Sequence, residues 1–260
     1  MLLNNDNYFS QEANQRYMSC SQYLQFTRCP AAAMAEIKGE YQRPDTAALL
    51  HGQYIDAYIS GELDDFLADN PKLISSRGAT KGQLKAEYRD LQRVIDRFES
   101  DKFFMDHLQG DKQVIVTGRI GQADFKGKID ILHADRIVDF KAVRDFADIW
   151  DQAKSLRVPF VEYWGYDVQA AIYQELIRQT TGERRPVFIA AVTKEPVPDL
   201  AVLSIPDEVL EVKLQEITYW SGAFAEIKSS SQPAERCGKC DYCKSTKVLT
   251  EAIPYYEVNK

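Results

Sequence analysis

Three strand-like runs follow one another between Lys112 and Val143, and they constrain the fold of this 260-residue chain more than any other segment. The runs are rich in Val, Ile and Phe, and they are separated by Gly121 and by the short sequence HAD. Strands joined by such tight turns pair side by side, so the segment predicts an antiparallel meander. A sheet therefore lies at the centre of the expected fold.

Helical patterns precede this meander. Capping residues and apolar spacing predict helices over 21–39, 46–61 and 82–99, with Pro30 as a kink or a restart in the first of them. The N-terminal part of the chain is therefore expected to be helical.

After the meander, the apolar spacing predicts a helix over 161–180, a buried strand over the run PVFIAAV, and a long helix from Leu210 to Ile227. This order of elements predicts an α/β fold in a single domain. Its parts are a helical region over 1–110, a core over 111–195, and a C-terminal helix with a cysteine-rich tail over 196–260.

The composition fits a globular protein without a membrane segment. Apolar residues make up 45% of the chain, enough for a hydrophobic core, and no apolar run approaches the roughly 18 residues of a membrane-spanning helix. The first residues lack the basic and apolar regions of a signal peptide, so a cytoplasmic protein is expected. The net charge of −7 argues against nonspecific adhesion to nucleic acid, although residues 112–144 carry seven Lys or Arg against four Asp.

Two acids and a lysine interrupt the last two strand-like runs. Residues two apart on a strand share a face, so Asp139 and Lys141 project together while Val138 and Phe140 point to the opposite layer. The turn HADR folds the preceding run back and is expected to bring Asp130 close to Asp139. A surface ion pair is the ordinary alternative for Asp139 and Lys141.

These residue types suit phosphodiester hydrolysis. Two adjacent carboxylates resist ionising together unless a cation lies between them, and hard oxygen ligands favour Mg²⁺ or Mn²⁺. A lysine beside such a metal can orient or deprotonate a water molecule, while the metal stabilises charge on the phosphoryl and leaving oxygens. The pattern predicts a metal centre at Asp130 and Asp139, with Lys141 beside it.

The segments GKIDIL, IVDFKAV and YDVQAAIYQELI resemble three successive motifs of the RecB-like branch of the PD-(D/E)xK nuclease superfamily. The motifs are Gly-x-x-Asp, an apolar residue with Asp-x-Lys, and a helix with Gln-x3-Tyr, and the likeness covers residues 115–180. It implies a restriction-endonuclease-like core in which Asp130 and Asp139 bind the metal and Lys141 serves the attacking water. Ile129 stands in place of the proline in the superfamily's name, and Asp139 in place of the commoner glutamate; both departures are frequent in this branch.

The resemblance extends to two helices. It places Gln169 and Tyr173 beside the catalytic site, and Tyr166 lies on the same helical face because these residues are three and four apart. Tyr166 and Tyr173 also fit ordinary core aromatics, whereas a buried Gln169 needs hydrogen-bond partners. In RecB-like and RecE-like nucleases a helix before the strands supplies a histidine ligand, which implies His51 here, although a lone histidine in an apolar helix is more often a core residue.

The sequence CGKCDYC places Cys237, Cys240 and Cys243 within seven residues. In a chain with an odd cysteine count this spacing favours thiols or metal ligands over disulfides, and it resembles part of a ferredoxin-like iron–sulfur ligand run. In the iron-staple nucleases among RecB-like proteins one cysteine precedes the core and three follow it, which implies a [4Fe–4S] cluster on Cys29 and these three. Zinc on the same four thiolates, Cys20 in place of Cys29, and three reduced thiols are the alternatives.

The resemblance implies a Mg²⁺-dependent DNA exonuclease that hydrolyses phosphodiester bonds from DNA ends, in phage or prophage recombination. RecE-like enzymes form toroidal homo-oligomers and work with a single-strand annealing protein, so both are expected by analogy. The alternatives are a structure-selective endonuclease with the same fold, a noncatalytic DNA-binding module and an iron–sulfur redox protein.

Overall fold

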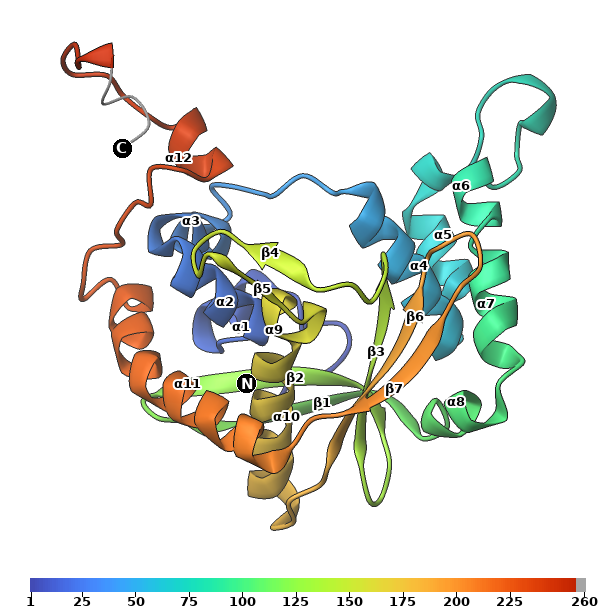
Figure 1. The fold of residues 1–260 in the computed structure, drawn as a ribbon. Coiled ribbons are helices and arrows are strands. Elements are labelled where there is room, and N and C mark those ends of the chain that lie inside the picture. The colour runs from blue at the N-terminus through green and yellow to red at the C-terminus, as the bar shows by residue number, and fades with distance from the viewer. Residues whose placement is uncertain (256–260) are drawn as a thin grey trace.

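Five strands form one mixed sheet in the computed structural model, which describes residues 1–255 (Figure 1). They are β1 (Asp111–Ile120), β2 (Ala123–Leu132), β3 (Ile137–Val143), β6 (Val187–Thr193) and β7 (Leu200–Ser204), in the order β1-β2-β3-β6-β7. The first three strands are antiparallel neighbours, β6 runs parallel to β3, and β7 runs antiparallel to β6. The predicted meander and the α/β class are confirmed. The last five residues of the predicted tail, 256–260, lie outside the described residues.

Helices stand both before and after the first three strands in the chain. Those before β1 are α1 (Gln11–Arg16), α2 (Cys20–Arg28), α3 (Pro30–Lys38), α4 (Ala47–Ser60), α5 (Leu63–Asp69), α6 (Ala86–Arg89), α7 (Gln92–Glu99) and α8 (Lys102–His107), with 3-10 turns at Pro71–Leu73 and Gly78–Thr80. Those after β3 are α9 (Phe160–Trp164), α10 (Tyr166–Thr181), α11 (Asp207–Lys228) and α12 (Asp241–Ser245).

Local chemistry sets the ends of the N-terminal helices. Pro30 restarts the chain as the first residue of α3, where its missing N–H would have no intrahelical partner in any case. Thr46 caps α4 by accepting a hydrogen bond from Leu49 N–H, and Gly61 ends the helix in the left-handed conformation, as predicted.

Two predicted helices are divided. The helix predicted over 82–99 is α6 and α7, joined by a tighter turn with hydrogen bonds three residues apart. The helix predicted over 161–180 is α9 and α10, separated by Gly165 at φ 74°. A Cβ at Gly165 would lie 2.9 Å from side-chain atoms of Leu24, so the close approach of α2 also favours glycine.

Three strands were not predicted. β4 (Ile149–Asp151) and β5 (Leu156–Val158) pair as a separate antiparallel hairpin, and β7 forms an edge of the main sheet. Runs of three residues are too short to display a period, and β7 has five residues without alternation between apolar and polar types.

The sheet separates two hydrophobic layers. On one face, α2, α10 and α11 cover a cluster that contains Ile129 and Ile137. On the other face, α4, α7 and α8 cover a cluster that contains Phe140. Side chains alternate along β3, so Asp139 and Lys141 project toward the α10 layer.

β2 leaves its neighbour β3 after a short contact. The two strands pair over two residues each, 131–132 with 137–138, whereas β2 pairs with β1 along nearly its whole length. Farther along, the edge of β2 meets the segment before α2, where Met18 bridges Phe125. Figure 1 shows β1 and β2 turning away from β3. The separation leaves room for polar side chains between the strands.

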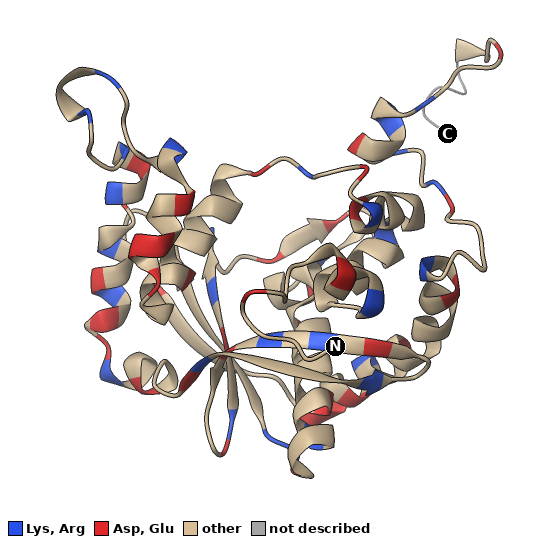
Figure 2. Ribbon diagram, turned by 180° about the vertical axis from the view of Figure 1, so that it is seen from behind, with Lys and Arg blue, Asp and Glu red and all other residues tan. Residues whose placement is uncertain are grey.

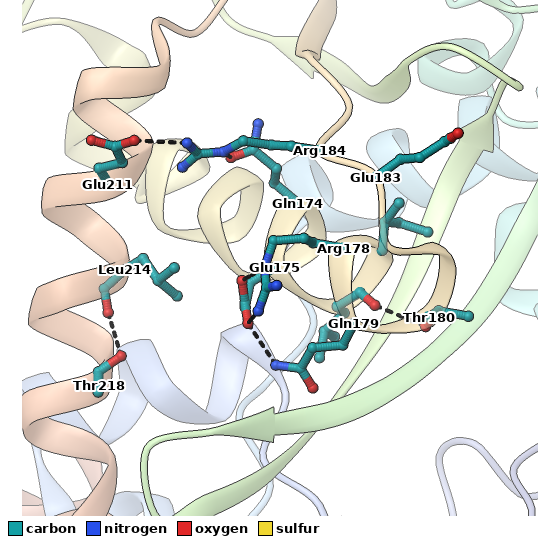
Figure 3. Close-up of polar contacts among 12 residues, drawn as sticks. Gln174, Glu175, Arg178, Gln179, Thr180, Glu183, Arg184, Glu211, Leu214 and Thr218 are labelled. Carbon is teal, nitrogen blue, oxygen red and sulfur yellow. Dashed lines mark hydrogen bonds and ion pairs between the residues drawn. The ribbon is translucent and has the colours of Figure 1, made fainter.

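Polar contacts fix α10 against β1 and α11, and Figure 3 shows the one between Arg184 and Glu211 of α11. Gln179 Nε2 donates to Arg119 O at 2.8 Å, and its Oε1 accepts from Arg119 N–H at 2.9 Å. Beyond the end of α10, Arg184 donates to Gln174 at 3.0 Å and to Glu211 at 2.7 Å. These bonds determine where the Gln-x3-Tyr motif of α10 lies relative to the sheet.

Charged residues of both signs are interspersed over the helices on both flanks (Figure 2). With a net charge of −7, attraction to a polyanion has to come from local groups. Within residues 1–255, none of the helices is both long and apolar enough to cross a membrane.

Candidate active site and cysteine cluster

Asp130 lies at the point where β2 separates from β3. The register that pairs Ile131 with Val138 places Asp130 opposite Asp139, where side chains lie close on one face. Asp130 Oδ2 accepts a hydrogen bond from Phe140 N–H at 3.0 Å. This bond replaces a bond of the strand ladder, so the carboxylate stays against β3 while the strands diverge. The structure thus brings the two predicted acids together.

Asp139 is the most buried member of the site. It is 3% exposed, and Lys141 Nζ lies 2.6 Å from its Oδ2. Within the described residues, neither carboxylate oxygen of Asp139 receives a well-aligned hydrogen bond. Burial raises the pKa of Asp139 to about 7; Lys141 lowers this pKa and Asp130 raises it. Asp139 Oδ2 therefore has the Lys141 ammonium as an ion-pair partner, whereas Oδ1 has no hydrogen-bond partner within the described residues.

Lys141 remains positively charged in this setting. Burial by itself lowers its pKa, but Asp139 and Asp130 outweigh this effect and raise the pKa above its ordinary value. Lys141 Nζ also lies 5.0 Å from the centre of the Tyr166 ring, within the range of a cation–π interaction. The lysine is an ammonium that can orient a water molecule or neutralise negative charge.

A third acid, Asp56 on α4, belongs to the same group of charges, and the sequence reasoning missed it. Burial raises the pKa of Asp56 to about 8; Asp130 raises it further, Lys141 lowers it, and Asp139 raises it. The available signal was an acid between the buried residues Ile55 and Ala57 of an apolar helix. The family resemblance implied His51 of the same helix instead.

His51 lies on a different side of α4. It precedes Asp56 by five residues, which corresponds to about 140° around the helix axis. Its ring packs edge-on against Tyr88 at 5.1 Å, and burial lowers its pKa, followed by the charge of Lys194, while Glu87 raises it. Nε2 of His51 has no hydrogen-bond partner in the described part of the chain. The role of His51 as a metal ligand stays a prediction, whereas Asp56 shares the electrostatics of the acidic pair.

The Gln-x3-Tyr motif forms a chain of hydrogen bonds from α10 to β2. Gln169 Nε2 donates to the Tyr173 hydroxyl at 2.8 Å, and that hydroxyl donates to Lys128 O at 2.9 Å. Burial, with Asp130 as the next contributor, raises the pKa of Tyr173 well above its ordinary value. Gly127 leaves space for the ring, since a Cβ there would lie 2.8 Å from it. The motif thus fixes β2 two residues before Asp130.

A cavity of about 370 Å³ lies beside this motif. Its lining includes Tyr166 and Gln169 from α10, together with Phe9, Arg43 and Trp164. Phe9 is 73% exposed and Trp164 is 47% exposed. The cavity therefore combines polar groups of the Gln-x3-Tyr motif with aromatic faces that are open to solvent.

The donor set fits a hard divalent cation. Asp56, Asp130 and Asp139 offer carboxylate oxygens beside the single ammonium of Lys141, and Asp139 Oδ1 is buried without a hydrogen-bond partner in the described residues. Mg²⁺ and Mn²⁺ prefer oxygen ligands of this kind. A bound cation would offset the repulsion between these neighbouring carboxylates.

The four predicted cysteine ligands form a second cluster. Cys29 comes from the junction of α2 and α3, and Cys237, Cys240 and Cys243 come from the C-terminal tail. All four Sγ atoms lie within 4.8 Å of one another. Cys20 lies elsewhere, packed against the main core, where burial raises its pKa to about 12. The structure therefore brings Cys29, not Cys20, to the tail.

A family model described as PDDEXK-like domain of unknown function (DUF3799) matches residues 19–246. The chain belongs to this family. Among solved structures, this PDDEXK-like protein is similar to the crystal structure of the "Putative exonuclease" from Eubacterium rectale, with 37% sequence identity and a TM-score of 0.92. The match covers 98% of this chain and 97% of that chain. Among the curated proteins, none matches it.

These comparisons confirm the predicted membership of the PD-(D/E)xK nuclease superfamily and the restriction-endonuclease-like core. They support a nuclease. PDDEXK nucleases typically use divalent metals, in agreement with the donor set around Asp139.

Proposed function

We propose that this PDDEXK-like protein is a metal-dependent DNA exonuclease that uses Mg²⁺ or Mn²⁺ held by Asp130 and Asp139. The observation that carries the proposal is the pair of Asp139 oxygens. They are buried, lack aligned donors within residues 1–255, and lie beside Lys141. Lys141 pairs with one of these oxygens and leaves Oδ1 without a partner in the described residues, so a bound cation would complete the environment that a buried carboxylate requires.

The chemistry requires a water oxygen to attack phosphorus while the bond to the leaving oxygen breaks on the opposite side. The water gives up a proton to solvent, and the leaving oxygen takes one from solvent. A divalent ion in this site would supply Lewis-acid stabilisation of negative charge on the phosphate. Lys141, as an ammonium, donates a hydrogen bond that orients the attacking water. The ring of Tyr166 packs against this ammonium. Gln169 and Tyr173 act at a distance by holding β2.

Attack from a DNA end is the mode that the RecE-like resemblance implies, and the similar Eubacterium rectale protein carries the name exonuclease. The cavity beside Tyr166 offers room for a nucleotide strand, and Phe9 and Trp164 offer faces on which bases can stack. The same resemblance suggests phage or prophage recombination, a toroidal homo-oligomer and a single-strand annealing partner.

The test compares a linear duplex labelled at one end with a covalently closed circle of the same sequence. With Mg²⁺ or Mn²⁺ the linear DNA should shorten from its ends and the circle should stay intact, and EDTA or the Asp139→Asn variant should prevent cleavage. Nicking of the circle would establish a structure-selective endonuclease instead. Binding without cleavage under every metal condition would establish a noncatalytic module.

A further inference from the structure

We propose that the four-cysteine cluster binds a single tetrahedral zinc ion instead of the [4Fe–4S] cluster that the iron-staple resemblance implies. The cluster is separate from the nuclease site, and the proposal does not depend on the proposed activity. It rests on the spacing of the four sulfur atoms.

The sulfur atoms are too close together for a cubane cluster. Cys243 Sγ lies 3.6 Å from Cys29 Sγ and 3.9 Å from Cys237 Sγ, and all four sulfurs lie within 4.8 Å of one another. Four thiolates at a Zn–S distance of about 2.3 Å in a tetrahedron stand about 3.8 Å apart. In a [4Fe–4S] cluster each thiolate binds a different iron at a corner of the cube, so the thiolate sulfurs stand on the order of 6 Å apart. The observed spacing fits one metal ion.

The backbone around the sulfurs fits the same geometry. Cys237 Sγ accepts hydrogen bonds from Lys239 N–H at 3.4 Å and from Cys240 N–H at 3.3 Å. Cys240 Sγ accepts one from Cys243 N–H at 3.4 Å. Gly238, at φ 73°, makes the tight turn between the first two cysteines possible. Such N–H donors stabilise thiolate charge in a metal site and orient the ligands.

The ligand set favours zinc and a structural role. Four thiolates close the coordination sphere, which is the pattern of structural zinc sites, and zinc binds such sites more tightly than ferrous iron. The ion would join two parts of the chain that lie 214 residues apart at Cys29 and Cys243. The backbone supports this junction, since Ala31 N–H donates to Glu235 O at 3.0 Å.

Metal content of the full-length protein tests the proposal directly. The protein is purified without a histidine tag and under nitrogen, and zinc, iron and acid-labile sulfide are measured per chain. We expect one zinc per chain, no sulfide and no brown colour. Four irons with sulfide, a single iron or no metal would each overturn the proposal. None of these readouts requires nuclease activity, so loss of the proposed function would not be mistaken for failure of the zinc site.

A pair of cysteine variants locates the ion. Cys237→Ser should lose the zinc and lower the melting temperature, whereas Cys20→Ser, the matched change at a cysteine outside the cluster, should keep one zinc per chain. Zinc retained by Cys237→Ser or lost from Cys20→Ser would contradict the assignment. If Cys237→Ser does not fold, cobalt exchanged into the wild-type protein decides the question. Cobalt should show the visible spectrum of a tetrahedral tetrathiolate, and any other coordination would contradict the proposal.

Discussion

Replacing Asp56 by Asn should make the metal-free protein more stable. Burial, with Asp130 as the next contributor, raises the pKa of Asp56 from 3.8 to about 8, and Lys141 offsets only part of this rise. Asparagine has nearly the same shape and carries no charge. The substitution therefore removes the cost of placing a third carboxylate beside two others.

The size of the effect follows from the change in pKa. An acid with a pKa of 3.8 in the unfolded chain and about 8 in the folded one destabilises the fold at pH 7 by up to roughly 4 kcal/mol. Asp56 is only partly buried and shares the cost with its neighbours, so we expect a gain on the order of 2 kcal/mol. For a chain of this size that gain corresponds to about 4–8 °C in Tm.

Thermal unfolding followed by circular dichroism in EDTA measures this gain. Because the pKa of Asp56 is raised in the folded protein, Asp56 costs no stability below pH 3.8, and its cost grows as the pH rises toward 8. The advantage of Asp56→Asn should therefore be large at pH 7 and small at pH 5. Asp56→Asn removes a carboxylate beside the metal site, so saturating Mn²⁺ should stabilise the wild-type protein more than the variant and narrow or reverse the difference in Tm. A metal at 100 times its Kd adds about 2.7 kcal/mol to the stability of a protein that binds it.

Asp111→Asn is the matched control, because Asp111 is an exposed acid at the start of β1. It should leave Tm unchanged within about 2 °C. The reasoning is refuted if Asp56→Asn lowers Tm in EDTA, or if its effect equals that of the control.

Three further changes test other parts of the account. Lys141→Met should lower cleavage by about 10²–10⁴-fold with an unchanged circular dichroism spectrum, and activity within tenfold of wild type would contradict its role. Tyr173→Phe leaves Lys128 O without its donor and should lower the free energy of unfolding, measured with urea, by about 1–3 kcal/mol. An unchanged urea midpoint would contradict this prediction. Burial, with Lys126 as a lesser cause, lowers the pKa of Lys228 to about 7, so the free energy of unfolding should rise with pH between 7 and about 10. Lys228→Met should flatten that rise. Equal slopes of the free energy of unfolding against pH in the variant and the wild type would exclude Lys228 as its cause.

Local signals predicted much of the fold. The helix from Thr46 to Gly61 was predictable because its cap and its terminal glycine act within one turn of the chain. The approach of Asp130 to Asp139 followed from the tight turn and the two-residue period of a strand. Where these short-range rules apply, sequence and structure agree.

The remainder depends on long-range packing. Asp56 and His51 differ by about 140° on one helix, and only the packing of α4 against β3 decides which side meets the acids. The hairpin of β4 and β5 has too few residues for a period to appear. The meeting of Cys29 with the tail was implied by a family resemblance, because no local rule links residues that lie 214 positions apart.

Anomalous diffraction from a crystal soaked in Mn²⁺ tests the central claim most directly. The account predicts a manganese peak coordinated by carboxylate oxygens of both Asp130 and Asp139. A crystal without manganese between these acids, or with manganese bound only elsewhere, would contradict it.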